Sequence, residues 1–513
     1  MVIVETLKNK NMTEFHQDNQ FYGFAKKVSA INYRLVSHAL GVLLWVEAAL
    51  FLLCAGICLW YNESDYMTFL ATMLLNLLVG GVMLAYGRGA DQEINRRDGY
   101  CIVSLCWLMF TAFGMLPFLF SGAVPSVTDA FFETMSGFTT TGATILDDIE
   151  SLSHGLLFWR SLTQWIGGLG IVIFSIALIP IFSESSQRLF LSEATGVTHD
   201  KIQPRTNLMA RYLWIVYIAL TLLETILLMF GGMSLFDAIC QSFATTATGG
   251  FSTKQASISY WDSAYIEYVV SIFMILSGVN FSLYFFFLKG RFNTLFKDEE
   301  LHWFLKSVFT LTFLITMALY LTDYYDLEKA FRKALFQVAT AHTSCGFATD
   351  DFNLWPPFTW MLLLFAMVSG GSTGSTSGGV KDLRLLIIAK KISNQFKQML
   401  HPRAVLPVKV NKTTVSDQIS SNVFIFFSAY LLLIVIGWTI LLGLGVGFIE
   451  SLSTVVSAIG NVGPGLGSCG PAYSWAHLPD AAKWVLSTLM FLGRLEIFGI
   501  LLLFYPRFWK ENG

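Results

Sequence analysis

The hydropathy pattern divides the chain into long apolar runs separated by short polar segments. About ten of these runs reach the length of about 20 residues that a helix needs to cross a bilayer. They lie at 36–60, 66–86, 101–121, 153–182, 208–231, 262–288, 302–322, 355–390, 420–447 and 476–505. The pattern therefore predicts an all-α multi-pass membrane protein.

Four shorter apolar segments alternate with these runs, at 126–138, 234–246, 330–342 and 450–459. Each is too short to cross the bilayer and is flanked by full runs, which predicts a half-helix that enters the membrane and returns. Behind two extra N-terminal spans, the unit of helix, half-helix, loop and helix is thus repeated four times. Non-helical backbone survives at membrane depth only where it lines a water-filled cavity or is buried in protein. We therefore expect the four loops to surround one pore.

The loops that follow the half-helices share one pattern. Each ends in a glycine, has a short polar residue two positions earlier, and has a charged residue 13 positions earlier. The glycines are Gly142, Gly250, Gly346 and Gly463, the polar residues are Thr140, Thr248, Ser344 and Asn461, and the charged residues are Asp129, Asp237, Lys333 and Glu450. A single loop of this kind would be an ordinary turn between helices. Four in one register predict a ring around one axis, as in the four subunits of a potassium channel.

The chemistry of this ring suits a dehydrated cation. A potassium ion without its water needs a cage of oxygen dipoles, which inward-pointing carbonyls supply. Glycine reaches the required backbone conformations most easily, and the Thr and Ser hydroxyls add oxygens or brace the loops. The expected K⁺ ligands, with K⁺ as the transported ion, are Thr140, Thr141, Gly142, Thr248, Gly249, Gly250, Ser344, Cys345, Gly346, Asn461, Val462 and Gly463.

A glycine-rich stretch, residues 370–379, interrupts the eighth run. Its five glycines, each about 1 kcal/mol worse than alanine in a helix, are Gly370, Gly371, Gly374, Gly378 and Gly379. At membrane depth such a break is expected to line the water path below the ring of four loops. A nucleotide phosphate loop is excluded, because Val380-Lys381-Asp382 stands where Lys-Ser/Thr is required and no strand precedes it.

Two arginines lie inside apolar runs, where a charge is costly and usually functional. Arg494 in the last run has two open interpretations: a positive barrier that faces the pore, or a structural contact with Glu496 or with carbonyls. Arg160, near the outer end of the fourth run, is expected to brace a half-helix. His342, in the third half-helix, is expected to be a packing residue and no ligand.

Composition agrees with a membrane protein and narrows its class. Hydrophobic residues make up 54% of the 513 residues and charged residues 13%, with a mean hydropathy of +0.58, whereas soluble chains carry about a quarter charged residues. The net charge of −2 excludes a nucleic-acid binder. The seven cysteines show no paired spacing and the eight histidines no metal spacing. A membrane enzyme would need a cluster of such ligands, so we expect a protein that is not an enzyme.

Basic residues fall on one side of the membrane when the runs alternate. They are Lys26, Lys27, Arg34, Arg88, Arg96, Arg97, Arg188, Lys201, Arg205, Arg211, Lys289, Arg291, Lys297, Lys306, Lys381, Arg384, Lys390, Lys391, Lys397, Arg403, Lys409 and Lys412. The positive-inside rule makes this side, and with it the N-terminus, cytoplasmic. The opposite side carries acids that either form a cation-attracting vestibule or are ordinary loop charges, namely Glu63, Asp65, Asp147, Asp148, Glu150, Asp350 and Asp351.

The glycine loops, the segment Gln164-Trp165-Ile166-Gly167-Gly168-Leu169-Gly170 and the segment Gly493-Arg494-Leu495-Glu496 resemble the Trk/Ktr/HKT superfamily of potassium transporters. The resemblance covers roughly 36–510, and the two extra N-terminal spans are similar to the TrkH/TrkG branch. It implies a protein of the bacterial cytoplasmic (inner) membrane, a homodimer with one pore per subunit, and a cytoplasmic nucleotide-binding regulatory (TrkA-like) subunit. It also implies that 370–379 is an intramembrane gating loop that obstructs the pore, with Arg494 beside it.

These expectations divide the chain into six segments. They are the cytoplasmic segment 1–35, the extra helices 36–100, and pore repeats 101–206, 207–300, 301–418 (with the gating loop) and 419–513. The predicted function is potassium uptake through a gated, channel-like pore. The alternative is a secondary symporter that couples potassium to H⁺ or Na⁺. It would need acids on the ion path, and the few acids within the spans are Glu47, Glu224 and Glu267.

Overall fold

The computed structural model describes residues 31–90, 95–178 and 206–509. Within them the fold is helical apart from one antiparallel hairpin, β1 (Lys409–Val410) and β2 (Thr413–Thr414), so the expected all-α class is confirmed. Most of the expected segment 1–35 and the end of the fourth run lie outside the described residues, as do Lys26, Lys27, Arg188, Lys201 and Arg205.

Six helical stretches of the described chain are long and apolar enough to cross a membrane. They are α2 (Tyr33–Trp60), α3 (Tyr66–Tyr86), α4 (Arg96–Gly114) with α5 (Leu116–Phe120), α9 (Thr206–Phe230), α14 (Glu299–Leu321) and α18 (Asp417–Gly443). The fourth apolar run forms α7 (His154–Leu178), and the eighth is divided into α16 (Pro357–Ser369) and α17 (Asp382–Leu400). The short connectors are η2 (Ser257–Trp261), α13 (Phe292–Leu295), η3 (Phe352–Leu354) and η4 (Gly467–Cys469).

Two runs that we expected to be continuous are sharply bent. The sixth run forms α11 (Ala264–Gly278) and α12 (Phe281–Leu288), which meet at 94°. The tenth forms α20 (Asp480–Arg494), followed after a 107° bend by α21 (Phe498–Leu501) and η5 (Leu502–Phe504). If each bent pair counts as one span, the described residues hold up to eight spans by length and composition. The prediction of unbroken helices at these two places was wrong.

The bend between α11 and α12 has a tertiary cause. The carbonyl of Gly278 accepts a hydrogen bond from Ser372 N (2.9 Å), and Phe281 N donates to Gly374 O (3.1 Å). Both partners belong to the glycine-rich stretch 370–379. Backbone groups that leave a helix at membrane depth need partners inside the protein, and this stretch supplies them.

The four half-helices lie where the apolar segments predicted them, with ends that agree to within three residues. They are α6 (Val127–Phe138), α10 (Leu235–Thr246), α15 (Leu327–His342) and α19 (Phe448–Gly460). Ser126 and Ser234 cap the first two by accepting a hydrogen bond from the amides of Asp129 and Asp237, which stabilises a helix start. The acids lie in the first turn, where the helix dipole favours negative charge. Because α15 begins earlier, Lys333 falls outside its first turn.

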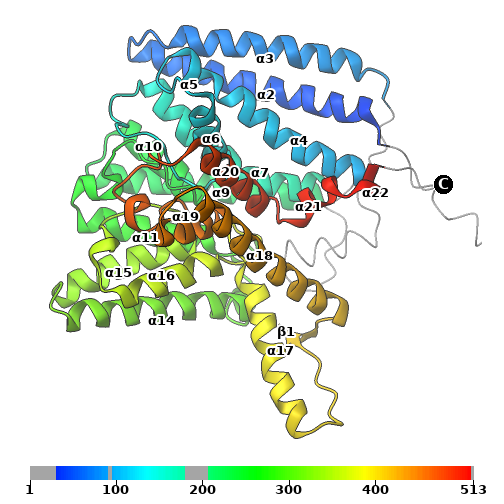
Figure 1. Cartoon of the computed structure of the whole chain (residues 1–513), viewed down its shortest axis with the longest axis vertical. Coiled ribbons are helices and arrows are strands. Elements are labelled where there is room, and N and C mark those ends of the chain that lie inside the picture. The colour runs from blue at the N-terminus through cyan, green and yellow to red at the C-terminus, as the bar shows by residue number, and fades with distance from the viewer. Residues whose placement is uncertain (1–30, 91–94, 179–205, 510–513) are drawn as a thin grey trace, which may run out of the picture.

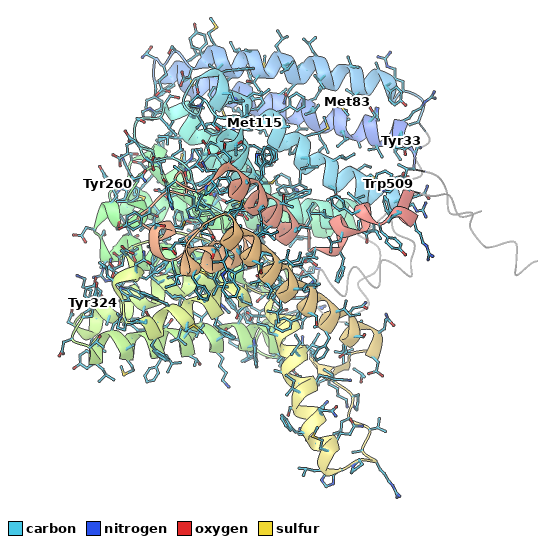
Figure 2. All side chains as sticks on the ribbon, viewed as in Figure 1. Tyr33, Met83, Met115, Tyr260, Tyr324 and Trp509 are labelled. Atoms are coloured by element: carbon cyan, nitrogen blue, oxygen red, sulfur yellow. The ribbon has the colours of Figure 1, made fainter. Side chains whose placement is uncertain are left out.

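The elements are arranged around the half-helices. Figure 1 shows α2 and α3 side by side along one edge, α14 along the opposite edge, and α17 with the β1–β2 hairpin projecting away from the body. Phe508 of the last helix, α22 (Pro506–Trp509), belongs to the same buried apolar cluster as Val36 and Leu40 of α2. Accordingly, Tyr33 and Trp509 lie at the same edge in Figure 2, opposite Tyr260 and Tyr324.

Helices α2 and α3 touch through two glycines. A Cβ added to Gly41 would lie 2.8 Å from Gly80 O, and one added to Gly80 would lie 3.0 Å from Gly41 O. Small residues at such crossings let membrane helices approach closely.

We expect Gly80→Leu to destabilise the protein by roughly 1–3 kcal/mol, the usual effect of overpacking, and to lower its melting temperature in detergent. Gly81→Leu, on the same helix, is the matched control, because a Cβ there meets nothing within 4 Å. Equal melting temperatures for the two variants would contradict the proposed contact.

Candidate ion pathway

The four glycine loops share one backbone conformation. The residue two positions before each glycine has a positive φ, namely Thr140 (51°), Thr248 (53°), Ser344 (53°) and Asn461 (53°), and so has each glycine, namely Gly142 (82°), Gly250 (77°), Gly346 (98°) and Gly463 (110°). Positive φ is costly for residues other than glycine and persists only where the surroundings impose it. Its recurrence in four loops points to one imposed geometry.

The same hydrogen bond fixes each loop to its half-helix. The amide of the residue before the glycine donates to the carbonyl five positions earlier, in the four pairs Thr141–Ser136 (2.8 Å), Gly249–Ala244 (2.8 Å), Cys345–Thr340 (2.8 Å) and Val462–Ser457 (2.9 Å). The loops therefore begin at the C-terminal ends of their half-helices. These ends carry partial negative charge, which stabilises a nearby cation.

The loops close into a ring. A Cβ added to any of the four glycines would lie no more than 2.6 Å from a carbonyl oxygen of the next loop, closer than real Cβ contacts come. The pairs are Gly142 with Gly249 O, Gly250 with Cys345 O, Gly346 with Val462 O, and Gly463 with Thr141 O. The fourth loop thus returns to the first, and all twelve predicted ring residues lie in these four adjoining loops.

A cavity of about 60 Å³ opens on the ring, and all four glycines line it. Its charged lining residues are Arg160 and Lys254, and none of the acids that we expected at a vestibule is among the lining residues. These acids therefore lie outside the lining of the cavity.

Two of these acids have structural partners instead. Asp147 accepts a hydrogen bond from the Ser474 hydroxyl. Asp350 Oδ2 accepts hydrogen bonds from Tyr325 OH (2.8 Å) and Trp355 Nε1 (3.0 Å). Burial and the neighbouring Asp350 carboxylate raise the pKa of Tyr325 above its ordinary value, so this phenol remains a hydrogen-bond donor at neutral pH.

Arg160 braces the first two loops. Its Nε donates to Glu133 Oε1 of α6 at 2.9 Å, and its two terminal nitrogens donate to Ser252 O (3.0 Å) and to Thr144 Oγ1 (3.3 Å). The guanidinium also stacks over the Phe251 ring, 4.2 Å from its centroid. Arg160 thus joins a half-helix to the segments that leave loops 1 and 2, as we expected from its position.

Sequence reasoning missed a further polar position, nine residues before each of the first three glycines. These side chains hold the chain after its loop through the pairs Glu133–Thr144 (3.0 Å), Gln241–Ser252 (2.7 Å) and Gln337–Asp350 O (3.4 Å). The signal was present, because all three side chains are polar and stand in the same register.

Two of the charged residues 13 positions before the glycines form ion pairs with other helices. Asp129 pairs with Lys483 (2.6 Å) and Lys333 with Glu267 (2.7 Å).

The glycine-rich stretch 370–379 is folded directly beneath the ring. Gly378 N donates to Ser344 Oγ (2.5 Å) and Thr376 Oγ1 donates to Thr246 O (3.0 Å). Gly370 and Gly379 lie back to back, so that a Cβ on Gly379 would be 2.7 Å from Gly370 Cα. The stretch is therefore a compact loop bound to loop 3 and to the half-helix before loop 2.

Arg494 binds this loop. Its terminal nitrogens donate to Thr376 O (2.7 Å) and Gly167 O (3.1 Å), and its side chain is buried. The alternative partner Glu496 pairs instead with Arg384 at 2.6 Å. The interpretation as an Arg494–Glu496 salt bridge was therefore wrong, and the contact with carbonyls is the one observed.

His342 is a packing residue, as expected. It is fully buried at the end of α15, its ring stacks on Phe304, and its Nε2 lies 2.8 Å from Ser307 Oγ. The same nitrogen is 3.4 Å from Asp382 Oδ2, at the start of α17. His342 thus connects the third half-helix to the helix that follows the intramembrane loop.

Comparison with known proteins gives concordant matches along most of the chain. A family model described as "TrkH: Cation transport protein" matches residues 65–511. The chain is 37% identical over 485 residues to the Trk system potassium uptake protein TrkH of Escherichia coli K12, covering 94% of this chain and 100% of that protein. It is 34% identical over 481 residues to TrkG of the same strain, covering 93% and 99%. The crystal structure of the potassium transporter TrkH from Vibrio parahaemolyticus matches with a TM-score of 0.85 and 35% identity, covering 94% of this chain and 100% of that one.

Breaking the buried Arg160–Glu133 pair from one side should be costly. We expect Arg160→Met to destabilise the protein by about 3 kcal/mol, because it leaves a buried carboxylate without its partner. The double variant Arg160→Met/Glu133→Leu should recover part of this loss, since it leaves no buried charge. Thermal unfolding of the single and double variants measures the coupling, and strictly additive losses would contradict it.

Proposed function

The chain belongs to the TrkH family of cation transport proteins, and we propose that it carries potassium into the cell through a channel-like pore in the cytoplasmic membrane. The relatives that match more than nine tenths of this chain are potassium uptake proteins and not enzymes. The observation that carries the proposal is the closed ring, in which each of the four glycines faces a carbonyl of the next loop.

The ring residues act as the selectivity filter. An ion that enters from the cavity exchanges its water for carbonyl oxygens of the four loops, and the C-terminal ends of the half-helices favour its charge. Each loop contributes one aligned glycine. We infer fewer defined ion sites than in a multi-carbonyl channel filter, and therefore weaker discrimination among potassium, rubidium and sodium.

A coupled symporter is the less favoured alternative. Two acids of the spans are engaged in structural contacts: Glu47 Oε2 accepts from Asn76 (2.9 Å), and Glu267 pairs with Arg332 and Lys333. The third, Glu224, is buried in α9. None of the three lines the cavity at the ring.

The intramembrane loop 370–379 acts as the gate. Its hydrogen bonds to Ser344 and Thr246, and the contact of Arg494 with Thr376 O, support a position across the path below the filter, with a positive charge beside it. Opening requires these contacts to break. The filter loops keep their own bonds to the half-helices, so that the gate can move without dismantling the filter.

Control of the gate comes from a cytoplasmic, nucleotide-binding TrkA-like partner of a homodimeric TrkH-type protein. The projecting α17 and the hairpin after it offer a docking surface, with basic residues and with exposed Phe396, Met399, Leu400 and Val405. The hairpin is connected to the loop 370–379 through the start of α14. Asn411 Oδ1 accepts from Glu299 N (2.8 Å) at the start of α14, and the adjacent Glu300 accepts from Thr373 N (2.5 Å) in the loop.

Gly142→Ser tests the filter. The new side chain would collide with Gly249 O, so we expect the rubidium-to-sodium flux ratio of the purified protein in liposomes to fall by about tenfold, which corresponds to roughly 1.4 kcal/mol. Gly122→Ser is the matched control, because Gly122 also has positive φ (75°) but nothing within 4 Å of its Cβ position. An unchanged ratio in Gly142→Ser, with flux retained, would remove Gly142 from the filter.

Arg494→Ala tests the gate. Two unit charges 4 Å apart repel by roughly 4 kcal/mol at an effective dielectric near 20, which slows passage about a thousandfold. Removing the charge, or shortening 370–379, should therefore raise cation flux in the absence of any partner while the ion ratio stays nearly constant. Arg494→Lys, which keeps the charge, should stay close to the wild-type flux. Flux at or below the wild-type level in both gate variants, with normal folding, would make the loop a structural kink.

A further inference from the structure

We propose that Gln164 of α7 determines specificity by positioning loop 2 of the ring, without itself binding the ion. The inference rests on the proposed filter function and adds to it a side chain that sets the spacing between the first two loops.

The carboxamide of Gln164 spans loop 2 with both of its ends. Its Nε2 donates to Gly249 O at 2.6 Å, and its Oε1 accepts from Phe251 N at 3.0 Å. The side chain is fully buried, so water does not compete for either bond. A buried amide with both ends satisfied fixes the segment on either side of Gly250 more firmly than one hydrogen bond does.

The residue type at position 249 supports this role. The other three loops carry Thr141, Cys345 and Val462 at the equivalent place, and Gly249 has no positive φ that would require glycine. A Cβ on Gly249 would instead lie 2.5 Å from Gln164 Cδ. The absence of a side chain at Gly249 therefore leaves room for the Gln164 carboxamide, so the two residues depend on each other.

The carbonyl oxygen of Gly249, which Gln164 binds, also lies at the contact between loops 1 and 2. The oxygen of Gly249 is the atom that a Cβ on Gly142 would meet first, so its position sets how closely the two loops approach. One turn earlier on α7, Arg160 binds Ser252 O and the Phe251 ring. Helix α7 thus holds loop 2 at two successive points.

A fixed spacing favours the larger ion. Sodium is smaller than potassium, so good coordination of sodium would require the ring to contract. The two hydrogen bonds of Gln164 oppose this movement at loop 2. Without them loop 2 can relax toward the axis, and discrimination against sodium falls while conduction persists.

The test is the rubidium-to-sodium flux ratio of the full-length protein in liposomes, a quantity that does not depend on how often the gate is open. Gln164→Leu removes both bonds and should lower the ratio by about fivefold, the equivalent of roughly one hydrogen bond. Gln164→Glu keeps the acceptor for Phe251 N but loses the donor to Gly249 O, and should also lower it. Trp165→Phe, the next residue on α7, removes the hydrogen bond to Thr221 but keeps an aromatic ring beside Phe243 of α10, and should leave the ratio unchanged.

A double-variant cycle tests whether the two positions act as one unit. Gly249→Ala alone should lower the ratio, because its methyl group displaces the Gln164 amide. The double variant Gly249→Ala/Gln164→Ala should have a ratio no lower than that of the more severe of its two single variants, Gly249→Ala and Gln164→Ala. Multiplicative effects would overturn the proposed pairing. A wild-type ratio in Gln164→Glu or Gln164→Leu, with flux retained, would overturn the positioning role and leave the filter intact. A wild-type protein that fails to prefer rubidium over sodium would overturn the proposed filter itself, and the inference with it.

Discussion

Backbone polar groups at membrane depth that have no helical partner must find hydrogen bonds inside the protein, and the whole structure depends on how this is achieved. The four ring loops bond back to their half-helices, as Thr141 does to Ser136. The loop 370–379 bonds to the ring through Gly378 and to the α11–α12 break through Ser372. The four ring loops, the loop 370–379 and the α11–α12 break therefore share one network of hydrogen bonds among groups that cannot remain unpaired.

The four loops share one backbone conformation, but different side chains support it in each repeat. Loops 1 and 2 are held by Arg160 and Gln164 of α7. The segment after loop 3 is held by Lys333, which donates to Thr349 O at 2.8 Å. Loop 4 uses its own Asn461, whose amide donates to Thr141 Oγ1 at 3.1 Å and so ties the last loop to the first. A ring of carbonyls needs only the backbone to be equivalent, and different side chains achieve this in each repeat.

The sequence predicted what depends on local pattern. The half-helix ends and the place of Gly250 in the fourfold pattern followed from a single register, and the structure gives Gly250 the positive φ. The bends at Asn280 and Ile497 were missed because hydropathy continues across them. Residues at the bends bind distant partners, since Phe281 N donates to Gly374 O and Glu496 pairs with Arg384. The acids after the loops were ambiguous for the same reason, since only tertiary structure shows that Asp350 is engaged by Tyr325 and Trp355.

We expect an ion without its water to bind within the ring of Gly142, Gly250, Gly346 and Gly463. Anomalous diffraction from crystals grown in rubidium would locate the ion directly. A rubidium peak should lie on the axis of the ring, at coordination distance from carbonyl oxygens of all four loops, and should be displaced by excess potassium. A ring without such a peak, in crystals whose rubidium occupies another site along the chain, would contradict this expectation.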